Sequence, residues 1–308
     1  MHNDPSTHSN QETGDQFTKK SADYLLNLPQ YLLPQRLITR VTYWLARIET
    51  PWFKNGFIHI FSRIFNVNMD EAQEPDYRAY RHFNAFFTRA LQPAARPLDT
   101  DDQRLCCPVD GTVSQAGDIV DDQLFQAKGR SFELPNLLGG DADLAQLFRD
   151  GTFATLYLSP RDYHRIHMPI RGVLREMVHI PGRLFSVSPL TTRVIPELFA
   201  RNERVVAHFD TSIGPMAMVL VGAINVASIE TVWAGVITPP LGTEIRRWSY
   251  PASGTDAVIL EKGAEMGRFN MGSTVIMLCG PDAVSWESEI HPGAAIRMGQ
   301  ALATIKAD

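Results

Sequence analysis

The sequence has few cysteines, no long apolar run and no excess of basic charge. Its three cysteines, Cys106, Cys107 and Cys279, show no C-x-x-C spacing. Neither a disulfide framework nor a cysteine metal site is indicated, and a reducing compartment is favoured. No stretch of about 18 consecutive apolar residues occurs, which argues against a transmembrane helix. With 29 basic and 34 acidic residues, the chain lacks the strong positive charge typical of nucleic-acid-binding domains, and we expect no nucleic-acid partner.

The N-terminus lacks the basic start and apolar core of a signal peptide. The first 16 residues, MHNDPSTHSNQETGDQ, are polar and predict a disordered tail on a protein that stays in the cytoplasm. The whole chain of 308 residues is 44% hydrophobic and 20% charged. This balance is that of a globular protein with enough apolar material for one large or two small cores.

Basic and aromatic residues gather near the N-terminus. Between Phe17 and Phe65, seven Lys/Arg stand against two Asp/Glu, a local balance of +5 in a chain of net charge −5. From Arg36 to Ile48, apolar residues recur at about 100° per residue, which predicts an amphipathic helix. The residues on its apolar face are Leu37, Val41, Trp44, Leu45 and Ile48.

Such a helix has two alternative roles. It packs on the protein's own core, or it lies in a lipid headgroup layer where flanking Arg side chains extend to the surface. The next segment, PWFKNGFIHIFSRIF, carries the same basic and aromatic mixture, which gives weight to the lipid alternative.

The remainder of the chain changes from helical to β-rich. A third helix is expected over Glu74–Leu91, and from about Leu105 short apolar runs alternate with Gly, Pro and Asp turns, as in β-strands. From His291 the sequence predicts a closing pair of strands joined by a Gly turn. The expected fold class is α+β, with N-terminal amphipathic helices followed by a mostly antiparallel, β-rich catalytic domain. The expected divisions are a tail at 1–16, a basic and aromatic helical region at 17–95, and the β-rich domain at 96–308.

Three segments of the β-rich part carry residue types suited to catalysis. Asp110 lies in CPVDGTVSQAG, although an Asp-Gly pair is most often a turn. His164 and His167 lie in YLSPRDYHRIHMP, directly after a short apolar strand, and loops at strand ends often display catalytic groups. No third ligand cluster accompanies the histidines, so we expect no metal. Ser273 follows Gly272 in RFNMGSTVIML.

An Asp, a His and a Ser in one chain permit a base-activated serine, in which the Asp orients the imidazole that takes the hydroxyl proton. The sequence has no G-x-S-x-G elbow of the α/β-hydrolase kind. Gly272 within an apolar run marks a bulge or a close backbone approach. The residues alone therefore leave open whether Ser273 is a nucleophile or an ordinary turn or strand residue.

The combined order and separation of these segments resembles the bacterial-type phosphatidylserine decarboxylases. CPVDGTVSQAG, YLSPRDYHRIHMP and FNMGSTVI carry the resemblance, together with PGRLFSVSP and LFARNERVV. The similarity extends from about Pro75 to the C-terminus, and the basic helical front also fits. One departure is Met271, where the family usually has Leu, and this change preserves volume and apolarity.

The resemblance implies a proenzyme that cuts its own chain between Gly272 and Ser273, into a β chain of residues 1–272 and an α chain of residues 273–308. Asp110, His167 and Ser273 would form the self-cleavage triad, with His167 as the base that Asp110 orients. Ser273 would become a covalent pyruvoyl group, the cofactor that forms a Schiff base with the substrate amine. His164 would handle protons during decarboxylation.

By the same resemblance, the reaction is the pyruvoyl-dependent decarboxylation of phosphatidylserine to phosphatidylethanolamine in phospholipid biosynthesis. The implied partners are the lipid substrate, an anionic membrane surface beneath the N-terminal helices, the two chains of one precursor and a homodimer. The expected location is peripheral, on the cytoplasmic face of the cell (inner) membrane. Two alternatives stay open: a serine hydrolase of unfamiliar fold that uses Asp110, His167 and Ser273, and a catalytically silent membrane-binding module.

Overall fold

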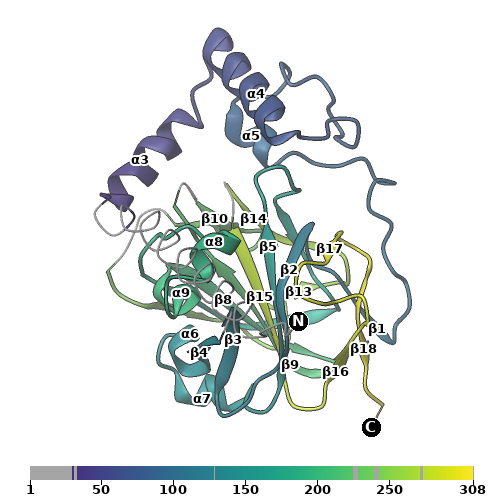
Figure 1. Cartoon of the computed structure of the whole chain (residues 1–308). Coiled ribbons are helices and arrows are strands. Elements are labelled where there is room, and N and C mark those ends of the chain that lie inside the picture. The colour runs from purple at the N-terminus through teal and green to yellow at the C-terminus, as the bar shows by residue number, and fades with distance from the viewer. Residues whose placement is uncertain are drawn as a thin grey trace, which may run out of the picture.

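The computed structural model describes residues 30, 33–127, 129–224, 228–238, 243–270 and 273–307, with the backbone alone for Ser273. The expected tail at 1–16, Met271 and Gly272 lie outside the described residues. The N-terminal helices lie over one edge of a β-rich body (Figure 1). All strand pairs of the described residues are antiparallel. The expected α+β class is confirmed.

The helices divide into a group near the N-terminus and several single turns within the β-rich part. The described helices are α3 (Gln35–Leu45), α4 (Pro51–Phe65), α5 (Phe83–Phe87), α6 (Leu134–Leu137), α7 (Ala142–Gln146), α8 (Pro189–Thr192) and α9 (Leu198–Arg201).

The largest sheet has the strand order β12-β7-β8-β9-β15-β5-β2-β17, and β13 also pairs with β7. Its strands are β2 (Gly111–Asp118), β5 (Thr152–Leu158), β7 (Gly172–Ile180), β8 (Arg204–Thr211), β9 (Gly214–Val221), β12 (Arg246–Ser249), β13 (Ile259–Leu260), β15 (Ser273–Cys279) and β17 (Ala295–Ile296). The described residues also form three smaller sheets. One contains β1 (Arg104–Cys106), β18 (Ala301–Ile305) and β16 (Val284–Trp286), and a second contains β11 (Gly235–Thr238), β10 (Ile229–Thr231), β14 (Glu265–Phe269) and β6 (Arg165–His167). The third is the pair of β3 (Gln123–Ala127) and β4 (Arg130–Glu133).

Strand β15 lies inside the main sheet, hydrogen-bonded to β5 on one side and to β9 on the other. Its residues from Thr274 to Cys279 are all buried. A strand covered on both faces reads as a continuous apolar run, which explains the sequence VIMLC. The apolar stretch after Ser273 is therefore a central strand of the protein core.

The third predicted helix, over Glu74–Leu91, is wrong for most of its length, since only α5 is helical there. The carboxylate of Glu74 accepts the backbone N–H of Asp76 at 2.9 Å, and that of Asp76 accepts the N–H of Arg78 at 2.9 Å. Such local side-chain bonds compete with helix formation. The aromatic residues of this segment instead pack with α4 in a separate apolar cluster made of Ala46, Ile58, Phe61, Phe83, Phe86 and Phe87.

The predicted amphipathic helix is confirmed as α3, which ends at Leu45. Its apolar residues Leu37, Val41 and Trp44 are 59%, 47% and 66% exposed, whereas Gln35 and Thr39 are buried. Leu37, Val41 and Trp44 therefore point away from the protein and do not pack on its core. Leu45 and Ile48, the other two residues of the predicted face, are partly buried. Within the described part of the chain, no helix is long and apolar enough to cross a membrane.

The predicted C-terminal strand pair is also wrong in its pairing. The two strands exist as β17 and β18, but β17 pairs with β2, and β18 lies between β1 and β16. Both strands follow the expected turn positions, so the sequence predicts their presence and not their partners.

Truncation of a core side chain in the main sheet should destabilise the protein strongly. Phe209 on β8 is fully buried, so Phe209→Ala leaves a cavity and should reduce the free energy of unfolding by about 3–5 kcal/mol. Phe125→Ala is the control, because Phe125 is 43% exposed on β3. Urea unfolding of both variants, made in the uncut Ser273→Ala chain, measures the difference. Equal losses would contradict the assigned burial.

Candidate active site

The register of the main sheet brings three of the predicted segments to one edge. Ser273, the first residue of β15, pairs with Leu158, the last residue of β5. Thr112, near the start of β2, pairs with Tyr157 on the same β5. Because adjacent strands lie about 4.8 Å apart, the turn that carries Asp110 is two strands from Ser273.

Gly111 has a structural reason to follow Asp110. A Cβ atom at this position would collide with the backbone carbonyl oxygen of Tyr157. The Asp-Gly pair is therefore needed for the close approach of β2 to β5, which holds the Asp110 side chain at the strand edge.

His164 is fully buried in the segment that joins β5 to β6. Its Nε2 donates to the carbonyl oxygen of Ser159 at 3.1 Å, and its ring stacks on Phe87 of α5 with centroids 4.0 Å apart. Since a carbonyl only accepts, Nε2 carries the proton and Nδ1 is the basic atom. Nδ1 is buried and has no hydrogen-bond partner among the described residues. Burial lowers the pKa of His164 to about 3, and the positive charge of Arg89 acts in the same direction.

His167 lies at the end of β6 and is held on both ring nitrogens. Nδ1 donates to the carbonyl oxygen of Gly263 at 2.8 Å, so Nε2 is the basic atom of the neutral ring. Nε2 accepts the Tyr163 hydroxyl proton at 3.0 Å. Burial lowers the pKa of His167, while the Gly263 carbonyl and the charge of Asp110 oppose this effect.

Asp110 and His167 are not hydrogen-bonded to each other. Arg96 Nε lies 2.8 Å and 3.0 Å from the two carboxylate oxygens of Asp110, and the backbone N–H of Met298 donates to Oδ1 at 2.8 Å. A second guanidinium nitrogen of Arg96 bridges Asp110 to Glu71. The expected direct orientation of His167 by Asp110 is therefore replaced in this structure by the Gly263 contact.

Several buried polar atoms near Ser273 lack partners in the described part of the chain. They are Ser159 Oγ, His164 Nδ1, Asn270 Nδ2 and Thr274 Oγ1. Buried polar groups are almost always hydrogen-bonded, so these unpartnered atoms indicate a site that can bind a further polar group. No group of three or more metal-binding side chains occurs among the described residues.

A polar cavity of about 430 Å³ adjoins this edge of the sheet. Its lining includes Asp110, Asp162 and Tyr163, together with Arg89 and Arg96. The cavity gives the edge of β2 an opening beside the charged Asp110–Arg96 pair.

Sequence reasoning missed Arg96, Tyr163, Asn84 and Phe87 as members of this region. Tyr163 lies inside the quoted motif YLSPRDYHRIHMP, so its position next to His164 was the available signal. Arg96 lies in a loop, and nothing in its local sequence marks it as the partner of Asp110. Asn84 Nδ2 donates to Asn270 Oδ1 at 2.8 Å and ties α5 to the segment before Gly272.

Two family models match this chain. Residues 83–304 match the family model described as "Phosphatidylserine decarboxylase", and residues 25–66 match a second model described as "PSD". The first match covers more than half of the chain and contains Asp110, His164, His167 and Ser273.

Similar curated proteins cover nearly the whole chain. A phosphatidylserine decarboxylase proenzyme of Pseudomonas putida is 55% identical over 279 residues, 91% of this chain and 97% of its own length. The corresponding proenzyme of Alkalilimnicola ehrlichii is 59% identical over 264 residues, 86% of this chain and 91% of its own. That of Azotobacter vinelandii is 55% identical over 280 residues, 91% of this chain and 98% of its own. These matches define a decarboxylase. The chain belongs to the phosphatidylserine decarboxylase family, as the resemblance predicts.

The buried neutral state of His164 should make stability depend on pH. In the unfolded chain His164 titrates near its ordinary value of about 6.5, and in the folded chain near 3, so the unfolded state binds more protons between these values. The stability gained by burying neutral His164 is complete above the pKa that His164 has in the unfolded chain, and it is lost as the pH falls below that value. Between pH 7.5 and 5.5 it lowers the free energy of unfolding by about 1 kcal/mol.

Urea titrations at the two pH values, in the uncut Ser273→Ala chain, measure this loss. His164→Gln should reduce the pH dependence by about the same amount, because the substituted side chain does not titrate. His291→Gln, at an exposed position, should leave it unchanged. A His164→Gln chain with the full original pH dependence would contradict the assignment.

Proposed function

We propose that this chain, as a member of the phosphatidylserine decarboxylase family, converts phosphatidylserine to phosphatidylethanolamine with a pyruvoyl group made from its own Ser273. The observation that carries the proposal is the identity of 55–59% with decarboxylase proenzymes over most of the chain. The edge of the sheet supports it, because Ser273 begins β15 next to the segment that holds His164.

The proposed first reaction is self-cleavage between Gly272 and Ser273. The Ser273 hydroxyl attacks the Gly272 carbonyl, the C–N bond between the two residues breaks, and an ester forms while the amine takes a proton. Removal of the Cα proton of Ser273 then expels the Gly272 carboxylate. Water completes the conversion of residue 273 to a pyruvoyl group and releases ammonia.

His167 is the proposed base for self-cleavage, with Nε2 as the accepting atom. The Gly263 contact at Nδ1 fixes the tautomer in which Nε2 is free to take a proton. Tyr163 occupies Nε2 in the described structure, so this hydroxyl must give way before the Ser273 proton is accepted. Asp110 acts through charge, since it favours the protonated form of His167.

The residues around Ser273 fit a small carbonyl-bearing group. Ser159, Asn270 and Thr274 each have an unpartnered donor on a segment that flanks Ser273, and His164 Nδ1 is an unpartnered acceptor. Bound in this way, a pyruvoyl group supplies an electron sink for the pair left when carbon dioxide departs. The three donors would orient the group. His164, neutral at rest, would take up a proton at Nδ1 and then deliver it.

The two chains would remain one folded unit after the cut. The proposed α chain, residues 273–308, supplies β15 between β5 and β9, β17 beside β2, and β16 and β18, of which β18 pairs with β1. The ladders of β15, β17 and β18 with strands of the proposed β chain would hold the two chains together.

The proposed location is the cytoplasmic face of the cell membrane, at an anionic surface. The apolar face of α3 is exposed, and α4 exposes Trp52, Ile60 and Ile64. Exposed aromatic and aliphatic side chains on basic helices suit a headgroup layer. A homodimer, implied by the family resemblance alone, completes the proposed assembly.

Ser273→Ala should abolish both the cut and the decarboxylation, because the attacking hydroxyl and the source of the pyruvoyl group are removed. Denaturing mass spectrometry of the parent protein should show pieces of residues 1–272 and 273–308, and the variant should show one intact chain. Phosphatidylethanolamine formation is measured in parallel. An intact parent chain that reacts with a fluorophosphonate would favour the serine hydrolase alternative. A parent chain that is neither cut nor reactive would favour a silent membrane-binding module.

His167→Ala and His164→Ala should separate the two reactions. His167→Ala should block the cut, since no base accepts the Ser273 proton. His164→Ala should still be cut but should decarboxylate about a hundred-fold more slowly or worse, as expected on loss of a general acid–base group. Gel analysis of the cut and release of carbon dioxide are the two measurements. Normal processing in both variants would contradict this division of roles.

A further inference from the structure

A cleft between α3 and the β-rich body has the character of an anion-binding site. Its volume is about 810 Å³, and it is formed by the start of α3, the segment from Pro181 to Leu184, Arg201 and Thr243. Four arginines line it and its described lining contains no carboxylate: Arg36, Arg40, Arg183 and Arg201. This volume lies in the range of small-molecule sites.

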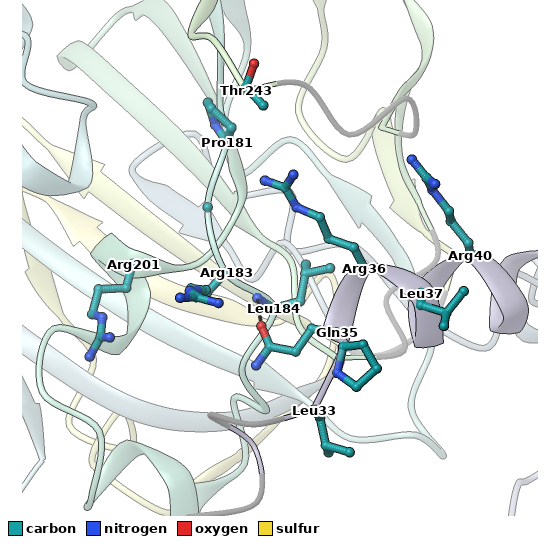
Figure 2. A pocket seen from close by; sticks show the side chains of 12 residues that line it. Leu33, Gln35, Arg36, Leu37, Arg40, Pro181, Arg183, Leu184, Arg201 and Thr243 are labelled. Carbon is teal, nitrogen blue, oxygen red and sulfur yellow. Dashed lines mark hydrogen bonds between the residues drawn. The ribbon is translucent and has the colours of Figure 1, made fainter.

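Three of these arginines have no carboxylate partner. Arg36, Arg40 and Arg183 belong to no ion pair among the described residues, whereas Arg165, Arg247 and Arg268 elsewhere in the chain are paired. In Figure 2 the Arg36 side chain extends from α3 toward the Pro181–Leu184 segment, where Arg183 lies, while Arg201 points away. Unpaired guanidinium groups that share a cleft favour an anionic ligand, because they match phosphate oxygens in geometry and charge.

The walls of the cleft are fixed before any ligand arrives. The Gln35 side chain accepts the backbone N–H of Leu184 at 3.0 Å, which fastens α3 to the opposite wall. The backbone of Arg183 is bonded to the segment from the end of α9 to the start of β8: its N–H donates to the carbonyl oxygen of Arg201 at 2.8 Å, and its carbonyl oxygen accepts the N–H of Glu203 at 2.8 Å. A rigid frame lowers the entropy that binding must overcome.

The cleft also adjoins an apolar surface. Leu37 lines it and belongs to the exposed face of α3, which continues through Val41 to Trp44. A ligand with a phosphate in the cleft and acyl chains along this face matches both halves of the site. Free phosphate or glycerol phosphate matches only the charged half.

The cleft is distinct from the polar cavity beside Asp110, because the two share no described lining residue. Asp110, His164, His167 and Ser273 are all absent from the described lining of the cleft.

We propose that this arginine cleft binds the phosphate headgroup of a second, non-reacting anionic phospholipid and so seats the enzyme on anionic bilayers. This inference rests on the proposed function in one respect: the headgroup site and the proposed membrane location both require α3 to lie at the lipid surface. It adds a defined headgroup site to a general attraction between basic helices and anionic lipid.

The test is a calorimetric titration with monomeric, short-chain phosphatidylglycerol, which has the anionic phosphate but no serine carboxyl group to lose. The cut enzyme should bind it saturably. Arg36→Gln and Arg183→Gln should each raise the Kd about ten-fold or more, the loss expected for a hydrogen bond to a charged group. Arg63→Gln, an exposed and equally charged position on α4, should stay within about two-fold, because a distant surface charge is screened. Gel analysis of the cut confirms that each variant has folded.

Several results would overturn the inference. These are absent saturable binding in the parent enzyme, an equal loss in Arg63→Gln, or binding of glycerol 3-phosphate as tight as that of the lipid. Competitive inhibition of phosphatidylserine turnover by phosphatidylglycerol, relieved in the cleft variants, would make the cleft the substrate's own phosphate site. The titration does not depend on turnover, so an inactive parent enzyme would refute the proposed function and leave the binding result to decide the cleft.

Discussion

Two ladders of backbone hydrogen bonds, from β15 to β5 and from β15 to β9, position the groups around Ser273. The pairing of Ser273 with Leu158 sets the first residue of β15 against the end of β5, and Ser159 follows directly to hold His164. A slip by one residue would turn every side chain of β15 to the opposite face. Because β15 is buried on both faces, such a slip would place side chains of different size and shape in closely packed positions, which costs free energy. Core packing therefore also fixes the position of Ser273.

The N-terminal helices and the active-site region are joined by specific contacts. Phe87 of α5 stacks on the ring of His164, and Asn84 of the same helix bonds to Asn270, just before the proposed cleavage site. Helix α5 packs in turn with α4 in the aromatic cluster around Phe61 and Phe83. The region that exposes apolar side chains therefore also helps to bury the histidine assigned to decarboxylation, and one segment serves both surface contact and chemistry.

The sequence predicts those helices and strands that carry local signals. It fails where the structure of a segment depends on contacts with other parts of the chain. Helix α4 is predictable because Pro51 suits its first turn and Asn66 ends it in a left-handed conformation. The segment over Glu74–Leu91 has helical periodicity, yet bonds from the Glu74 and Asp76 side chains direct its first part into turns. Periodicity alone gives the same pattern for a buried and an exposed apolar face, so the outward orientation of α3 needs the structure.

The candidate site divides in a similar way. Asp110, His164, His167 and Ser273 are identified by motifs, because the residue types and their order suffice for the resemblance. The tautomers of the two histidines and the Arg96–Asp110 pair depend on carbonyls and loops distant in sequence, among them Gly263. Neither the pairing of distant strands nor the contact of Arg96 with Asp110 leaves a pattern in the local sequence, because both arise only in the folded protein.

The place of β15 in the strand order also has a consequence for biosynthesis. Strands β5 and β9 are formed from residues 152–158 and 214–221, yet they are joined only through β15, which ends at Cys279. A chain emerging from the ribosome therefore has a gap in the middle of its sheet until Cys279 has been made. The surroundings of Ser273 do not exist before that moment. The proposed self-cleavage is thus deferred, by topology alone, until the strands on both sides of β15 have been made.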